Sequence, residues 1–327
     1  MTQVVEAPGG RTLSVETHGA PEGQPVFLLH GTPGSRHGPN PRGIVLYRLG
    51  IRLICYDRPG YPGSSRFRAR RVSDAVVDVE AIANHFGIDR FSVVGRSGGA
   101  PHALACAALL KDRVICAAAL GSLAPYKAEG LDWRAGMAKS NVEAYEYAAE
   151  DLSALEATLG ERAVHVRGDS ESLLKELWPE LVGHDKNVIG DIGLRRIIAK
   201  THAEALRESA HGWIDDVIAL SRPWGFKLSD ITAPVKLWHG SDDVFSPKDH
   251  TYWLAKRIPT ADPDVETGVA HFGAVENLPR ILTWVVKQVN NEPRAERSAA
   301  GGGTGTRPLS LAGAGPGPVS AEVGVAR

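Results

Sequence analysis

The sequence lacks a strong charge of either sign and lacks a long, uninterrupted apolar run. Its 37 lysines and arginines nearly balance its 38 aspartates and glutamates, and both signs are interspersed along the chain. This balance argues against a surface that binds nucleic acid or an anionic membrane. The longest apolar region, residues 103–123, is interrupted by Lys111, Asp112 and Arg113, which favours a buried helix and a buried strand over a membrane span. We therefore expect neither nucleic acid nor a membrane as a partner.

Cysteine is also scarce. The three cysteines, Cys55, Cys106 and Cys116, lie inside apolar segments and form no CxxC pair, which indicates buried free thiols in a reducing compartment. The first six residues have neither the basic start nor the apolar core of a signal peptide. These absences predict a cytoplasmic protein, and 327 residues are enough for one large or two ordinary domains.

Short apolar runs alternate with helical patterns in much of the chain. Two of these runs, residues 26–29 and 52–56, are continuous, as expected for strands that are covered on both faces. The pattern predicts an α/β fold with a mainly parallel central sheet flanked by helices. Glycine-rich and polar motifs follow the C-terminal ends of the expected strands, which is where parallel sheets bind ligands.

The middle of the chain has a different pattern. Strand-like runs disappear between residues 122 and 230, and we interpret this region as a helical cap inserted into a core of residues 1–121 and 231–290. Residues 291–327 are rich in Gly, Ala, Pro, Ser and Arg, and we expect a disordered tail without a catalytic part. Tryptophans of the cap either line an apolar pocket or pack the cap on the sheet, and both options stay open. They are Trp133, Trp178, Trp213 and Trp224.

The clearest motif is Gly-x-Ser-x-Gly at residues 95–99, between a β-prone run and a helical run. It has the form of a nucleophile elbow, in which a sharp strand-to-helix turn strains the central serine and requires small neighbours. The turn presents the Ser97 hydroxyl above the strand ends. The next N–H, that of Gly98, lies at the positive end of the new helix and is a candidate oxyanion donor.

A serine hydroxyl is a poor nucleophile near neutral pH and needs a base, which in turn needs a carboxylate to orient it. Both residue types occur after Ser97. Asp242 and Asp243 follow an expected strand at residues 235–238, and His271 follows the last one. The order nucleophile, acid, histidine is the order of the nucleophile-elbow architecture.

The segments at residues 30, 57, 95, 240 and 271 resemble the α/β-hydrolase fold superfamily, specifically its serine-nucleophile branch with a helical cap. The resemblance covers about residues 10–290. It implies that Ser97 is the nucleophile, that His271 is the general base and acid, and that Asp243 is the triad acid, with Asp242 as the alternative.

The same resemblance implies an oxyanion hole. The loop at residues 30–34 is similar to the family's HG loop, and its Thr32 N–H is the expected second donor beside Gly98, because Pro33 has no N–H. The resemblance requires no metal and no organic cofactor. The segment at residues 57–64 resembles a family motif whose usual role is structural.

The resemblance implies a serine hydrolase that cleaves a small-molecule carboxylic ester or lactone through an acyl-enzyme. Dehalogenases and epoxide hydrolases of this fold have Asp at the elbow, so Ser97 argues against both. A carbon–carbon bond hydrolase, a hydrolase-fold receptor without turnover and a homo-oligomer remain open. A Rossmann dehydrogenase does not fit, because residues 95–99 are not GxGxxG.

A proline-iminopeptidase-like amidase is the main alternative, because residues 30–34 resemble that family's HGGPG loop. Such an enzyme needs a carboxylate of the cap to bind the substrate's amine. The available carboxylates are Glu143, Glu146, Glu150 and Glu204.

Overall fold

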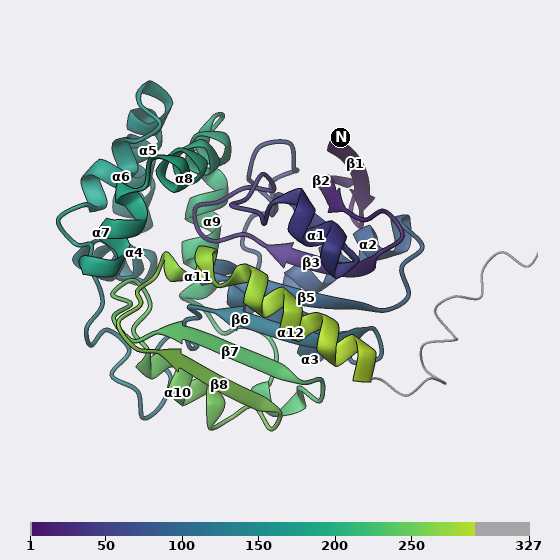
Figure 1. The fold of residues 1–327 in the computed structure, drawn as a ribbon. Coiled ribbons are helices and arrows are strands. Elements are labelled where there is room, and N and C mark those ends of the chain that lie inside the picture. The colour runs from purple at the N-terminus through teal and green to yellow at the C-terminus, as the bar shows by residue number, and fades with distance from the viewer. Residues whose placement is uncertain (1, 292–327) are drawn as a thin grey trace, which may run out of the picture. The chain divides into compact units, whose positions relative to one another are not determined.

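The computed structural model describes residues 2–291, which form an eight-stranded sheet with helices on both faces (Figure 1). The strands lie in the order β1-β2-β4-β3-β5-β6-β7-β8; β1, β2 and β4 pair antiparallel, and all pairs from β4 onward are parallel. The prediction of a mainly parallel α/β sheet is therefore confirmed. The strands are β1 Thr2–Ala7, β2 Arg11–Gly19, β3 Gln24–Leu29, β4 Ile51–Tyr56, β5 Phe91–Arg96, β6 Val114–Leu120, β7 Val235–Gly240 and β8 Ala261–Glu266.

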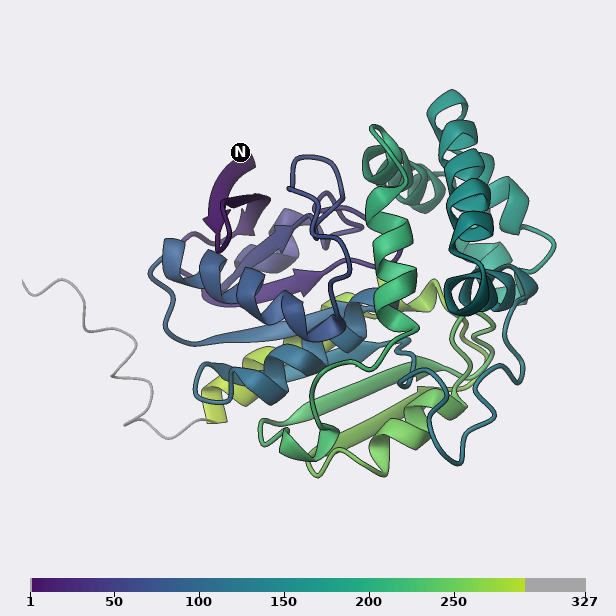
Figure 2. The same cartoon turned by 180° about the vertical axis from the view of Figure 1, so that it is seen from behind.

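Successive residues of a strand point to opposite faces, so a continuous apolar run fills two layers at once. In β3, Val26 and Leu28 belong to one buried cluster, while Phe27 and Leu29 belong to the other. Figure 1 shows α1 and α12 in front of the sheet, and Figure 2 shows α2, α3 and α10 on the opposite face. The bounds of these helices are α1 Gly43–Leu49, α2 Ala75–His85, α3 Ala100–Leu109, α10 Asp249–Ala255 and α12 Leu278–Asn291.

All regular structure between β6 and β7 is helical, and Figure 1 shows these helices grouped at one end of the sheet. We call α4 to α9 the cap helices. They are α4 Lys139–Glu150, α5 Leu152–Gly168, α6 Ser172–Leu177, α7 Gly183–Gly190, α8 Ile192–Leu206 and α9 His211–Leu220. The sheet and the cap helices belong to one compact unit. Among the helices of residues 2–291, none has the length and apolar character needed to cross a bilayer.

Short elements complete the fold. They are the 3₁₀ turns η1 Val72–Asp74, η2 Ser97–Gly99 and η3 Leu228–Asp230, and the one-turn helix α11 Gly273–Glu276. The β1–β2 hairpin turns at Gly9 and Gly10, whose φ angles of +81° and +70° suit glycine. Apart from Asn291, which ends α12, the predicted disordered tail of residues 291–327 lies outside the described residues.

Candidate active site

Ser97 lies between the end of β5 and the start of α3. Its φ of +52° is in the left-handed region, which residues other than glycine seldom adopt, so the backbone is strained at the expected nucleophile. A Cβ atom on Gly95 would lie 2.6 Å from Ala100 Cα, and one on Gly98 would lie 2.8 Å from Thr32 Cβ. Any larger residue at these two positions would collide with backbone or a neighbouring loop, which explains the small residues around Ser97.

Asp243 and His271 form a hydrogen-bonded pair from two loops that follow adjacent parallel strands. His271 Nδ1 lies 2.8 Å from Asp243 Oδ2. The other carboxylate oxygen, Oδ1, accepts the N–H groups of Phe245 at 2.8 Å and Ser246 at 2.9 Å. Because an ionised carboxylate only accepts hydrogen bonds, Nδ1 of His271 carries the proton and Nε2 is left as an acceptor.

The neighbouring carboxylate does not share this environment. Asp242 is exposed and accepts a hydrogen bond from the Ser241 hydroxyl at 2.7 Å, whereas Asp243 is buried against the imidazole. Of the two aspartates that the sequence left open, Asp243 is the one in contact with His271.

Electrostatics reinforce the Asp243–His271 pair. Burial alone would raise the pKa of Asp243, but the His271 charge and hydrogen bonds from His239 and His271 hold it far below its ordinary value. Burial alone would lower the pKa of His271, but the charge and hydrogen bond of Asp243 outweigh this effect and raise the pKa above 6.5. The imidazole is therefore a stronger base than its burial would allow.

One cavity of about 130 Å³ brings the expected catalytic groups together, because Ser97, Thr32 and His271 all line it. A smaller cavity of about 40 Å³ is lined by Ser97, Thr32 and Gly98. The cap helices line another part of the larger cavity, through Ser140, Asn141, Arg162, Leu173, Leu177, Ile198, Thr201, His202 and Trp213. The room suits a small ligand, since an apolar cavity of about 150 Å³ is enough for benzene.

The cap tryptophans divide between lining and packing. Trp213 lines both cavities. Trp133 packs edge-on against Tyr145 and donates to Ala124 O, and Trp224 stacks on Phe226. Trp178 is 44% exposed. Of these four tryptophans, Trp213 is therefore the one that lines the two cavities.

The expected oxyanion donors stand close to one another, because the Thr32 side chain packs directly on the Cα of Gly98. Neither the Thr32 N–H nor the Gly98 N–H donates to an acceptor among residues 2–291. The Thr32 hydroxyl donates to Asp216 Oδ2 at 2.6 Å, which ties the loop after β3 to cap helix α9. Two unused N–H groups beside Ser97 are what a tetrahedral oxyanion requires.

The loop that contains Thr32 is hydrogen-bonded to a network of buried ion pairs around Asp216. Asp216 of α9 pairs with Arg58 and with Arg70, and it also accepts the Tyr61 hydroxyl at 2.8 Å. Arg58 donates to Gly31 O at 3.0 Å. Burial would raise the pKa of Asp216, but Arg58 and Arg70 hold it well below the ordinary value. The resemblance implied only a structural role for the segment that contains Arg58, and no sequence motif pointed to Asp216, whose partners lie on other elements.

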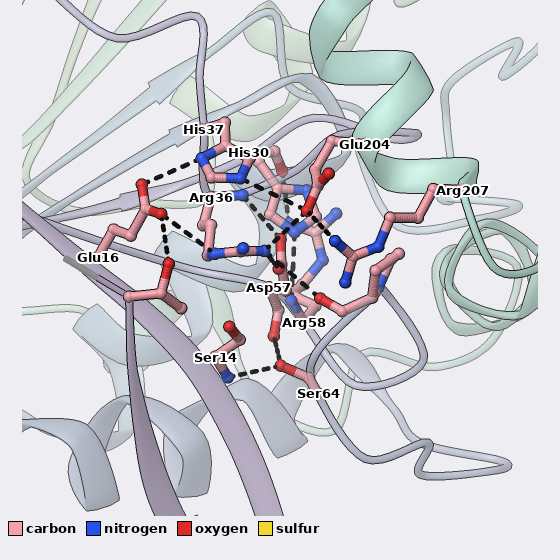
Figure 3. Close-up of polar contacts among 12 residues, drawn as sticks. Ser14, Glu16, His30, Arg36, His37, Asp57, Arg58, Ser64, Glu204 and Arg207 are labelled. Carbon is pink, nitrogen blue, oxygen red and sulfur yellow. Dashed lines mark hydrogen bonds and ion pairs between the residues drawn. The ribbon is translucent and has the colours of Figure 1, made fainter.

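A second network joins β2, the loop after β3 and α8, as Figure 3 shows. Arg36 pairs with Asp57 and contacts Glu16 at 3.5 Å and Glu204 at 3.3 Å. Burial raises the pKa of Asp57 to about 6 although Arg36 acts in the opposite direction. Glu204 also lies 3.4 Å from His37 Nε2, so its carboxylate is already engaged by the core.

The other carboxylates considered for an amine substrate lie elsewhere. Glu146 pairs with Arg134 at 2.6 Å and Glu143 lies 3.5 Å from Lys139. None of Glu143, Glu146, Glu150 and Glu204 lines either of the two cavities described above, and among the described residues that line these two cavities none is Asp or Glu.

Two further histidines pack inside the core. His102 Nδ1 lies 2.8 Å from Gly98 O, and burial together with the Arg58 charge lowers the pKa of His102 to about 3. His239 Nδ1 lies 2.7 Å from the Thr251 hydroxyl. Within residues 2–291, no group of three or more His, Cys, Asp or Glu side chains is arranged to hold a metal ion.

Arg96 and His202 also line the larger cavity, although the sequence analysis did not select them. Arg96 is the first of the two variable positions of the elbow motif, directly before Ser97. Its place next to Ser97 is the one feature of the sequence that could have pointed to Arg96. No motif surrounds His202, so the sequence offered no reason to select it.

Comparison with known proteins gives three kinds of match. A family profile described as alpha/beta hydrolase fold matches residues 24–278. Epoxide hydrolase B of Mycobacterium tuberculosis is 34% identical over 113 residues, which are 34% of this chain and 31% of that protein. Proline iminopeptidase of Xanthomonas citri is 38% identical over 102 residues, which are 30% of this chain and 32% of that protein. The chain thus spans about a third of the length of these curated relatives.

Among solved structures, a thermophilic esterase from Thermogutta terrifontis matches with a TM-score of 0.63 and 20% identity, covering 89% of this chain and 98% of that chain. At this identity the match shows a shared fold and nothing more.

Proposed function

This chain belongs to the alpha/beta-hydrolase fold family, and we propose that it is a serine hydrolase that cleaves a small carboxylic ester or lactone through an acyl-enzyme. One observation carries the proposal. The strained Ser97 and the imidazole of the Asp243–His271 pair line the same cavity, beside the unused N–H groups of Thr32 and Gly98. This is the set of groups that acyl transfer needs.

The proposed reaction begins when Ser97 Oγ attacks the substrate carbonyl carbon and passes its proton to His271 Nε2. The resulting oxyanion accepts hydrogen bonds from Thr32 and Gly98, and losing one such donor typically costs ~10²–10³ in turnover. The carbon–oxygen bond then breaks, and His271 donates the proton to the leaving alkoxide. Water repeats the sequence on the acyl-enzyme, which releases the acid and restores the Ser97 hydroxyl.

Asp243 supports both halves of this cycle. It fixes the tautomer of His271 in which Nε2 accepts a proton, and its negative charge stabilises the imidazolium that forms. Its two backbone donors, the N–H groups of Phe245 and Ser246, keep the carboxylate in place. The charge pair forms only when the proton transfers, so it stabilises the transition state more than the ground state.

The relatives named above suggest other reactions. Epoxide hydrolysis in this fold uses an aspartate at the elbow, and this chain has Ser97 there, so we do not assign it. A proline-iminopeptidase-like amidase remains the second candidate because of the matched segment. The cavities weigh against it, since no described lining residue is a carboxylate that could bind an amine.

A fluorophosphonate probe tests the nucleophile. The wild type should be labelled, Ser97→Ala should not, and His271→Ala should label far more slowly because the base is gone. Ser153→Ala, which changes an exposed serine of α5, is the control and should label like the wild type. Undiminished labelling of Ser97→Ala would reject Ser97 as the nucleophile.

A substrate panel tests the bond type. We expect turnover of short-chain 4-nitrophenyl esters and none of a prolyl-arylamide. Turnover of the amide without the esters would replace the proposal with the amidase. Cleavage of a 1,5-diketone alone would favour a carbon–carbon bond hydrolase, and binding without any turnover would favour a receptor.

A further inference from the structure

Arg96 is a buried cation without a carboxylate partner. The residue is only 8% exposed, although it lines the larger cavity. The one hydrogen bond from its guanidinium to residues 2–291 runs from Nη1 to Pro39 O at 3.1 Å, and no Asp or Glu in that part of the chain forms an ion pair with it. Buried charges in proteins are normally paired, so this site lacks a negative partner.

The positive charge of Arg96 acts on two histidines that line the same cavity, His202 and His271. Burial lowers the pKa of Arg96 to about 10, so the guanidinium still carries its charge near neutral pH. That charge contributes to lowering the pKa of His202, and it opposes the raised pKa of His271. A bound anion would offset the positive charge next to the catalytic imidazole.

His202 of α8 supplies a second polar group that lacks a partner. The residue lines the same cavity and is 9% exposed, and its buried Nδ1 forms no hydrogen bond with any residue among 2–291. Burial, with the Arg96 charge as the smaller cause, lowers the pKa of His202 to about 4. The ring is therefore neutral near pH 7 and retains one N–H that can donate to a ligand.

The other arginine of the cavity is already neutralised. Arg162 of α5 donates from Nε to Glu176 at 2.7 Å. The unmatched positive charge of the cavity is therefore that of Arg96, and no lining carboxylate in the described chain would repel an anion.

We propose that the cavity binds a small substrate that carries a carboxylate in addition to its scissile ester or lactone bond, and that Arg96 binds this carboxylate. This inference rests on the proposed function and specifies its substrate class. Arg96 and Ser97 are consecutive and line one cavity of about 130 Å³, so one small molecule can contact both. His202 is positioned to donate a further hydrogen bond to the anion, and the apolar residues Leu173, Leu177 and Ile198 cover the carbon chain.

A matched pair of substrates tests this. Monomethyl succinate and methyl 4-methylpentanoate have the same number of heavy atoms and differ in that an isopropyl group replaces the carboxylate. We expect wild-type kcat/KM for the hemiester to exceed that for its neutral counterpart by about 10- to 100-fold, the range of one or two hydrogen bonds to a charged group. The difference should lie mainly in KM.

Arg96→Met removes the charge and keeps a side chain of similar length. It should reduce the hemiester preference, the ratio of kcat/KM for the two esters, to about one, whatever the change in the absolute rates. His202→Phe should lower the preference by a smaller factor. Arg195→Met is the control, because Arg195 lies on the same helix as His202, contacts Glu171 and does not line the cavity.

The outcomes separate the two proposals. A wild type that hydrolyses both esters equally, or an Arg96→Met variant that keeps the full preference, overturns the carboxylate site and leaves the hydrolase intact. A wild type that neither labels at Ser97 nor hydrolyses any ester overturns both. If Arg96→Met does not fold, the wild-type ratio and the His202→Phe variant decide. Competitive inhibition of neutral-ester hydrolysis by succinate supports the site, and its absence contradicts it.

Discussion

His271 is subject to two opposing influences at the scale of a single residue. Its burial favours the neutral ring, and the Asp243 carboxylate, 2.8 Å away, favours the charged ring. The second influence is larger, so the pKa of His271 lies above 6.5. A general base must be neutral when it accepts a proton, and the activity of this protein should therefore depend on pH in a defined way.

We predict that kcat/KM falls on the acid side of a midpoint above pH 6.5, as His271 becomes protonated. In Asp243→Asn the carboxylate charge that raises the pKa of His271 is lost, while the burial that lowers this pKa remains. The midpoint should therefore move below pH 6.5, and kcat should fall by about 10⁴-fold. The measurement is a pH–rate profile on a neutral ester for both proteins. A midpoint that stays in place in Asp243→Asn would show that another group titrates.

Single residues also show what the sequence could predict. Ser97, Asp243 and His271 each follow a strand end, and the motifs around them made them candidates in the sequence, with Asp242 as the alternative to Asp243. Asp216 and His202 sit on ordinary helices, and their importance comes from partners or cavities far away in the sequence. Arg96 lies inside a motif, but its lack of a carboxylate partner is visible only in three dimensions.

At the scale of elements, the strand-to-helix turn depends on close backbone packing. Gly95→Ala would place Cβ 2.6 Å from Ala100 Cα, and we predict a loss of about 1–3 kcal/mol in the free energy of unfolding, with a large fall in kcat. The control is Gly160→Ala inside α5, where a Cβ meets nothing within 4 Å. This change should stabilise the protein by about 0.5–1 kcal/mol. Chemical denaturation measures both, and equal effects would contradict the packing argument.

Helix α9 anchors the loop of Thr32 through Asp216. Asp216→Asn leaves Arg58 and Arg70 buried without their counter-ion, so we predict a loss of about 3–5 kcal/mol in the free energy of unfolding. The displaced loop should also lower kcat by about 10- to 100-fold. Glu208→Gln, at an exposed site, is the control and should change stability by less than about 0.5 kcal/mol.

The pH dependence of stability offers a separate check on Asp216. Its pKa in the folded protein lies well below the ordinary value, so its contribution is present above the unfolded pKa of about 3.9 and is lost as pH falls toward the folded value. Unfolding free energies measured across this acidic range should decline more steeply for the wild type than for Asp216→Asn. Parallel curves would mean that the network does not hold the carboxylate in its charged form.

A strong apolar pattern in the sequence predicts that a helix or strand exists, but it does not predict the residues at which that helix or strand begins and ends. The apolar spacing of residues 274–289 favours a single helix, but the structure has α11 and α12 with a break at Asn277, because Pro279 has no N–H and its ring crowds the carbonyl of the preceding turn. The sequence of residues 141–159 likewise favours one helix, but the structure divides it at Asp151, whose side chain caps α5 by accepting from Ala154 N. Ser73 is a residue type that favours an N-cap, but it lies inside η1, and α2 begins at Ala75 with Asp74 as its N-cap and no side-chain cap hydrogen bond.

At the scale of the whole described molecule, the cap helices are joined to the sheet by the Asp216 and Glu204 ion pairs and belong to the same compact unit. We predict that α9 and β5 open together, with free energies of hydrogen exchange within about 1 kcal/mol of each other. Native-state exchange followed by mass spectrometry measures this. Much faster exchange throughout α9 would show that the cap unfolds independently of the sheet.

The central claim is that Ser97 becomes acylated with help from His271 and Asp243. The most direct measurement is the intact mass of protein quenched within milliseconds of mixing with a 4-nitrophenyl ester, followed by peptide mapping. We predict a transient mass increase equal to the acyl group, located on Ser97 and absent from Ser97→Ala. Turnover with no adduct, or an adduct on another residue, would contradict the account.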